Sequence, residues 1–103
     1  MVTASDVTLV ALALEGTKAS RHFHRTAFKV RRIYATLAAD GLSVNLKLNP
    51  DEQEMKCLVR PEAFAPVPNK WGKQGWTVAT LAALTVDDMR SALHAAWAHA
   101  GPP

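Results

Sequence analysis

Hydrophobic and polar residues alternate with a period of two in the middle of the chain. In residues 42–48 (LSVNLKL), Leu42, Val44, Leu46 and Leu48 fall on one side, and the polar residues fall on the other. Such alternation predicts a strand with one buried and one solvent-facing side. The Asp-Gly pair at 40–41 is a turn signal, so this strand is predicted to pair with the segment before it.

Five other segments are also predicted to be extended. Residues 18–23 are polar and fit an edge strand, and prolines around residues 64–67 confine that segment to an edge as well. In residues 33–38 we expect Tyr34 and Thr36 to face outward. They would form a polar sheet face with Ser43, Asn45, Lys47 and Lys29. The predicted strands are residues 18–23, 27–30, 33–38, 42–48, 64–67 and 76–81.

Three segments have helical periodicity. The first is predicted near residues 5–15, with Ser5-Asp6 at its start and Gly16 after its end. Val7, Val10, Ala11 and Leu14 would form its apolar stripe.

The second and third helices have clear start signals. Asn49, Pro50 and Glu52 form a capping box with proline at the first helical position. This helix is predicted to reach about Leu58, burying Met55 and Leu58. A last helix is capped at Thr85-Val-Asp-Asp88, and its apolar stripe contains Val86, Met89, Leu93, Ala96 and Trp97.

The composition predicts a single domain, and the charged residues are unevenly distributed along the chain. The chain has 103 residues, 49% of them hydrophobic, which suits one domain over residues 1–103 with one core. The net charge is +3, but residues 16–39 contain six cations and no acid. A basic patch favours polyanions, whereas the plain alternative is a solvated strand face. The six cations are Lys18, Arg21, Arg25, Lys29, Arg31 and Arg32.

Trp71 and Trp76 bracket a loop that contains Gly72, Gly75 and the cations Lys70 and Lys73. The glycines suit a tight connection between extended segments. Trp76 is interpreted as a core residue. Trp71 has two interpretations, a ring folded over the sheet edge or a ring that stacks on a nucleic-acid base beside Lys70 and Lys73.

Other patterns give little sign of catalysis or metal chemistry. His22 and His24 could supply half of a metal site, but no third ligand lies nearby in sequence. No phosphate loop, nucleophile elbow or HExxH motif occurs, so we expect a non-enzyme without cofactor or metal. The lone Cys57 is expected to fill core space and excludes an internal disulfide.

Several features predict a cytoplasmic protein. The N-terminus lacks the basic region of a signal peptide, and no apolar run is long enough to span a membrane. The single cysteine suits a reducing compartment.

The order of motifs resembles the MmcQ/YjbR family over nearly the whole chain. These motifs are Gly16, His22-Phe23, Ala27-Phe28-Lys29-Val30, Ile33-Tyr34-Ala35, Leu46-Lys47-Leu48 with Asn49-Pro50, and Lys73-x-Gly75-Trp76 before Leu81. The resemblance implies an α+β fold of two layers, related to the CyaY (frataxin-like) fold. An antiparallel sheet would carry the N-terminal, middle and C-terminal helices on one face. Two departures are Glu15, where proline is common, and Arg31-Arg32 in place of a glycine-containing turn.

Members of this family are often described as DNA-binding, without an accepted enzymatic activity. The first hypothesis is therefore a monomeric, weakly specific DNA-binding module that contacts phosphates. The second is an adaptor that recruits a protein partner through its exposed sheet face. A small-ligand or metal carrier, by analogy with frataxin, is disfavoured because no acidic ridge is evident. The predicted nucleic-acid contacts are Lys18, Arg21, Arg25, Lys29, Arg31, Arg32, Lys70, Trp71 and Lys73.

Overall fold

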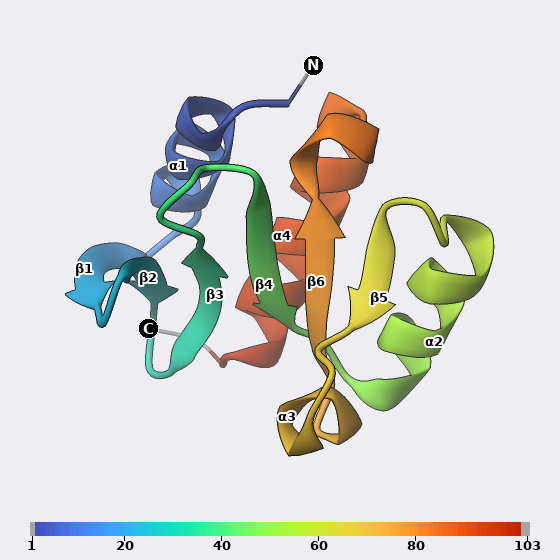
Figure 1. Cartoon of the computed structure of the whole chain (residues 1–103). Coiled ribbons are helices and arrows are strands. Elements are labelled where there is room, and N and C mark those ends of the chain that lie inside the picture. Colours follow the sequence, from blue (N-terminus) through green and yellow to red (C-terminus); the bar gives the residue numbers. More distant parts are fainter. Residues whose placement is uncertain (1, 102–103) are drawn as a thin grey trace.

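The computed structural model describes residues 2–101, which form one six-stranded sheet with helices around it (Figure 1). All neighbouring strands are antiparallel, in the order β1-β2-β3-β4-β6-β5. This arrangement confirms the predicted α+β class and all six predicted strands. The strands are β1 (Lys18–His22), β2 (Arg25–Lys29), β3 (Ile33–Leu37), β4 (Ser43–Lys47), β5 (Phe64–Pro66) and β6 (Trp76–Thr80). The helices are α1 (Ala4–Ala13), α2 (Pro50–Val59), α3 (Lys70–Lys73) and α4 (Val86–His99), with a 3-10 turn at Leu81–Ala83.

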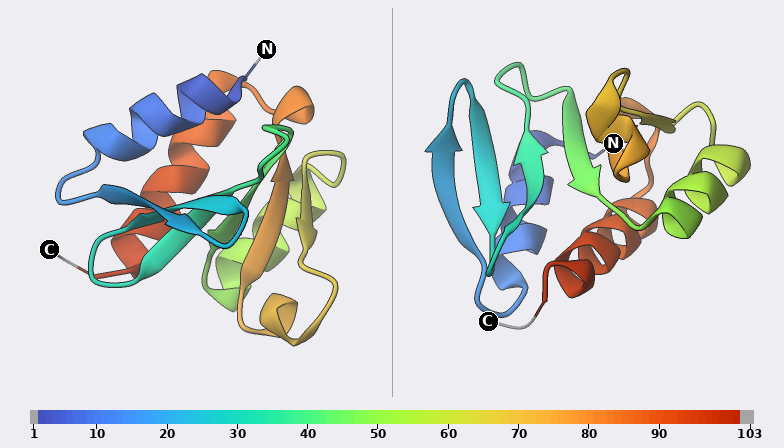
Figure 2. Two further views of the ribbon diagram at one scale, coloured as in Figure 1. Left: turned by 60° about the vertical axis from the view of Figure 1, so that its left-hand side comes forward. Right: turned by 90° about the horizontal axis from the view of Figure 1, so that it is seen from below.

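The helices are distributed unequally around the sheet. α1 and α4 pack against each other and lie on one side of the sheet, where α4 crosses β3 and β4 (Figure 2). α2 flanks the β5 edge. Within residues 2–101, no long helix covers the opposite side, which we call the open face. No helix within this range has the length and apolar character needed to cross a membrane.

The core lies between the sheet and the α1–α4 layer. It contains Phe28, Leu46, Leu48, Met89 and Leu93, each almost inaccessible to solvent. The predicted stripe of α4 is confirmed at Met89 and Leu93, whereas Val86 at the start of the helix is about half exposed. Trp97 packs against this core, and its indole N–H donates to the backbone carbonyl of Glu15 at 2.9 Å. This hydrogen bond ties the end of α4 to the segment after α1.

All three long helices begin with a capping box. The predicted caps Asn49 and Thr85 are confirmed. For α1 the prediction was wrong, because Thr3 and not Ser5 is the cap. The Thr3 hydroxyl accepts from the Asp6 N–H at 3.2 Å, and the Asp6 carboxylate accepts from the Thr3 N–H. Asp6 was correctly predicted to lie in the first turn of the helix. It is the third helical residue and completes the capping box with Thr3.

A β-bulge in β3 overturns the predicted outward position of Tyr34. Phe28 pairs with Ala35, but Lys29 pairs with Ile33, which leaves Tyr34 as an extra residue. The bulge breaks the alternation, and the Tyr34 ring is fully buried. Its hydroxyl lies 2.9 Å from the Thr17 hydroxyl and 3.5 Å from the Ala11 carbonyl oxygen. Burial raises the pKa of Tyr34, and the Thr17 hydrogen bond partly opposes this rise.

Three predicted core positions are exposed instead. Leu42 lies in the turn before β4, where its N–H donates to the Asp40 carboxylate, so its side chain points into solvent. Met55 and Leu58 are largely exposed because α2 packs mainly against the short edge strand β5. Cys57 is the partly buried residue on α2 that packs against the core, as expected, and burial raises the pKa of its thiol.

The tryptophan loop contains the short helix α3, which the sequence analysis did not predict. Asn69 caps it, and both glycines are required by close backbone approaches. A Cβ at position 72 would lie 2.0 Å from the Val67 carbonyl oxygen, and one at position 75 would lie 1.8 Å from that of Leu48. Gly75 also has φ +105°, which side chains rarely adopt. The loop is therefore a rigid connection between β5 and β6.

Candidate nucleic-acid interface

A shallow groove of about 290 Å³ lies on the open face. The β1–β2 hairpin supplies one side, the segment from Val67 to Trp71 supplies the other, and β3, β4 and β6 contribute residues between them. No acidic residue lines it. The groove residues are His22, Arg25, Thr36, Asn45, Val67, Asn69, Trp71 and Trp76.

Arg25 is the main fixed charge of the groove. Its Nε–H donates to the Thr36 hydroxyl and one terminal N–H donates to the Thr36 carbonyl, both at 2.8 Å. The other three N–H donors of the guanidinium make no hydrogen bond within residues 2–101. Burial lowers the pKa of Arg25, and the charge of Asp40 partly opposes this shift. Thr36 thus holds a charged group in position without neutralising it.

Two lysines extend the positive charge along the same face of the hairpin. Lys18 pairs directly with Lys29, and His22 pairs with Arg25, so the four side chains share one face of the two strands. Like charges directly opposite each other are unfavourable, and an anion bound between them relieves the repulsion. Of the six-cation run, Lys18, Arg25 and Lys29 therefore point to the open face.

The remaining cations of that run lie elsewhere. Arg21 pairs with Thr26 on the opposite face and lines a separate hollow near Ala4. Arg31 and Arg32 form the bend between β2 and β3, and Arg32 lies beside the last turn of α4. The structure does not bring these three arginines into the groove.

α3 carries the cations on the other side of the groove. Trp71 is 49% exposed, and the Lys70 ammonium lies 5.7 Å from the centre of its ring. Lys73 is exposed at the end of the same helix. The Trp71 backbone N–H donates to the Asn69 side chain at 2.8 Å, which fixes the turn that presents the ring. Because the ring lines the groove, both interpretations of Trp71, sheet-edge packing and ligand contact, fit its position.

Six of the groove residues were not predicted as nucleic-acid contacts: His22, Thr36, Asn45, Val67, Asn69 and Trp76. Trp76 was interpreted as core, but it is only partly buried and its ring lines the groove. Val67 was predicted only as the end of a strand, and Asn69 was given no role. The Asn69-Lys-Trp-Gly order is itself a helix-start signal, which could have indicated that Trp71 is held on a fixed turn.

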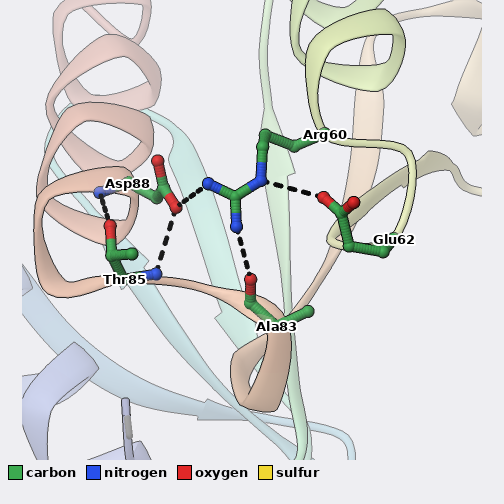
Figure 3. A network of polar contacts seen from close by, with 5 residues as sticks. All are labelled: Arg60, Glu62, Ala83, Thr85 and Asp88. Atoms are coloured by element: carbon green, nitrogen blue, oxygen red, sulfur yellow. Dashed lines mark hydrogen bonds and ion pairs between the residues drawn. The ribbon is translucent and has the colours of Figure 1, made fainter.

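A second arginine shows a contrasting environment (Figure 3). Arg60 donates to the Glu62 carboxylate at 2.8 Å, to Asp88 at 2.7 Å and to the Ala83 carbonyl at 2.9 Å. The hydrogen bond that Arg60 donates to Glu62 and the charge of Asp88 raise the pKa of Arg60. Among residues 2–101, both ion pairs belong to Arg60. This network joins the end of α2 to the start of α4.

Metal ligands do not gather in the described part of the chain. Across residues 2–101, no three His, Cys, Asp or Glu side chains come close enough to hold a metal ion. His22 instead contacts the Phe23 ring edge-on, at 4.8 Å between ring centres.

The architecture is that of a two-layer α+β domain with one open sheet face. The chain belongs to the YjbR family, whose family model matches residues 12–99. A similar solved structure is that of the Deinococcus radiodurans protein DR2400, described by the family-model domain DUF419. It has 24% sequence identity to this chain and a TM-score of 0.80, over 93% of this chain and 76% of the other. At this identity the likeness concerns the fold alone. No curated protein matches the chain.

Proposed function

We propose that the chain is a small, monomeric, non-enzymatic DNA-binding module whose open face contacts the phosphate backbone. The observation that carries this proposal is the state of Arg25. Thr36 orients its guanidinium beside a groove without acids, and three of its N–H donors remain available. An arginine held in this way suits a phosphate, because little side-chain freedom is lost on binding.

Two lysines on the same face of the hairpin support the same proposal. Lys18 and Lys29 place two more charges on the face that carries Arg25. Contacts to phosphates position a protein without reading base sequence, so weak specificity is expected. The groove is also small and open for a site that encloses a small molecule, which disfavours the carrier hypothesis. We place this activity in the cytoplasm, and the proposal involves no cofactor or metal.

Fluorescence anisotropy with generic labelled DNA tests the proposal. Three phosphate contacts would make log K fall by roughly 3 per decade of salt for a duplex, and Arg25→Gln should reduce this slope by about one. Arg90→Gln is the matched control, because Arg90 is exposed on α4. No binding at low salt, or equal losses in the two variants, would refute the proposal.

An adaptor function has some support in a different region. α2 exposes three large aliphatic side chains, Met55, Leu58 and Val59, whereas the open face combines cations and polar side chains with aromatic rings. Exposed apolar patches mark protein-binding surfaces more often than polar ones do. The variant Met55→Ser/Leu58→Ser separates the two ideas, since it should leave DNA affinity unchanged if the open face is the binding surface.

A further inference from the structure

The tip of the β1–β2 hairpin carries an aromatic residue that folding does not explain. Phe23 is 83% exposed and has φ +58°, and it is the only non-glycine residue with positive φ within residues 2–101. A bulky side chain in this region is a conformational outlier, and glycine or asparagine would make the same turn with less strain. The ring buries little surface in return: it contacts the His22 ring edge-on and otherwise faces solvent.

The surroundings of Phe23 connect it to the groove. It lies directly between His22, which lines the groove, and His24, which precedes Arg25. The exposed Phe23 ring contacts the His22 ring edge-on, and His22 lines the groove together with the arginine that Thr36 holds in place.

A second exposed ring stands on the other side. Trp71 lines the groove from α3, and the Asn69 cap and the Gly72 backbone approach keep its turn rigid. The two rings come from segments far apart in the sequence, and the cationic groove lies between them.

We propose that Phe23 and Trp71 are stacking platforms for unpaired bases, so that the preferred ligand of the groove is a single strand. Aromatic rings stack on any base, and they favour strands whose bases are not already stacked in a duplex. The phosphates would lie along Arg25, Lys18 and Lys29, while bases turn toward the rings. This inference rests on the proposed function and adds the class of nucleic acid to it.

The test compares three 12-nucleotide probes at low salt: a thymidine single strand, an abasic single strand and a duplex. We expect the thymidine strand to bind about tenfold more tightly than the other two, because only it offers bases to stack. Phe23→Asn and Trp71→Ala should each weaken that binding about tenfold, with an unchanged salt slope because no charge is removed. Binding of the abasic strand should remain unchanged in both variants.

Two further variants keep the result interpretable. Trp71→Phe should restore most of the affinity, and Leu58→Ala on α2 should have no effect. Phe23→Asn should also raise the melting temperature by roughly 3–6 °C, because asparagine tolerates the positive φ. A loss of binding in this variant could then not be attributed to unfolding.

The outcomes distinguish the two proposals. Equal affinity for the three probes, with no effect of Phe23→Asn or Trp71→Ala but with the Arg25 dependence retained, would overturn the stacking inference and leave the proposed function intact. Absence of binding to all three probes would overturn both.

Discussion

Arg25 and Arg60 both donate hydrogen bonds to backbone and side-chain oxygens, but only Arg60 is paired with carboxylates. Arg60 donates to two carboxylates and a carbonyl, and the Glu62 and Asp88 carboxylates raise its pKa, so its charge is paired inside the protein. Arg25 meets only the hydroxyl and carbonyl of Thr36, and burial lowers its pKa. The first arrangement stabilises a contact between helices. The second leaves an oriented positive charge available to bind a phosphate of a ligand.

The two regions around these arginines differ in the same way. The Arg60 network connects α2 to the cap of α4, where Thr85 and Asp88 also bond to each other (Figure 3). The groove has no ion pair within the described residues, and it is lined by Arg25 and by the Trp71 and Trp76 rings. We therefore expect variants near Arg60 to change stability and variants in the groove to change binding.

The largest expected effect comes from reversing charge on the hairpin face. Lys18→Glu/Lys29→Glu should weaken DNA binding at low salt by more than about 30-fold, because two phosphate contacts become repulsive. Arg31→Glu/Arg32→Glu is the control with the same charge change, placed at the bend outside the groove. Its loss should be several-fold smaller in the same anisotropy titration. Equal losses would mean that net charge, and not the position of the lysines on the hairpin face, controls binding.

Exchanging the two arginines for methionine tests the comparison directly. Arg60→Met should lower the melting temperature because Asp88 and the Ala83 carbonyl lose their partner, with DNA affinity within about twofold of the wild type. Arg25→Met should weaken DNA binding and change the melting temperature less than Arg60→Met does, since the hydrogen bonds of Arg25 are only to Thr36. Thermal unfolding and anisotropy on the same samples check both. A stability loss in Arg25→Met as large as that in Arg60→Met would break the contrast.

Tyr34→Phe tests whether the bulge places this ring on the helix side. Loss of the hydroxyl should cost about 1 kcal/mol, because the Thr17 hydroxyl loses its partner in a buried site. Urea unfolding measures the change. Binding of DNA should be unaffected, and a binding defect in a stable Tyr34→Phe protein would place the ring on the open face after all.

The smallest effect concerns the pH dependence of the Arg60 region. The backbone N–H of Thr85 is the first cause that lowers the pKa of Asp88, and Arg60 contributes to the same shift. A lowered carboxyl pKa in the folded state stabilises the protein above the unfolded pKa of about 4, and this contribution is lost as pH falls through the folded value.

Asp88→Asn should therefore be less stable than the wild type at pH 7, by less than about 1 kcal/mol because the carboxylate is near the surface. The difference should shrink toward pH 3 in urea unfolding. A difference that is constant between pH 7 and pH 3 would show that the ionised carboxylate is not responsible.

Local signals in the sequence accounted for much of the fold. Alternation gave the inward residues Val44, Leu46 and Leu48, and the capping box at Asn49 located α2. Tyr34 could not be placed, because the bulge depends on how β3 pairs with β2 and leaves no local mark. Met55 and Leu58 were misplaced because their exposure depends on how little of the sheet α2 covers.

The candidate site was harder to predict than the fold. Arg25, Lys18 and Trp71 were named as contacts from charge and residue type alone. The strand register was needed to show that Arg21 lies on the opposite face. The position of the bend was needed to show that Arg31 and Arg32 lie outside the groove. The groove itself brings His22 close to Trp71, and no pattern within either segment indicates that meeting.

The most direct test of the central claim uses the three tryptophan indole N–H signals in a 15N-correlated spectrum of the intact protein. Trp71 and Trp76 line the groove, whereas the Trp97 indole donates to Glu15 on the helix side and serves as an internal control. On addition of a short thymidine strand at low salt, the Trp71 and Trp76 signals should shift and the Trp97 signal should stay in place. A shift of Trp97 alone, or no shift of any of the three at saturating strand, would contradict the account.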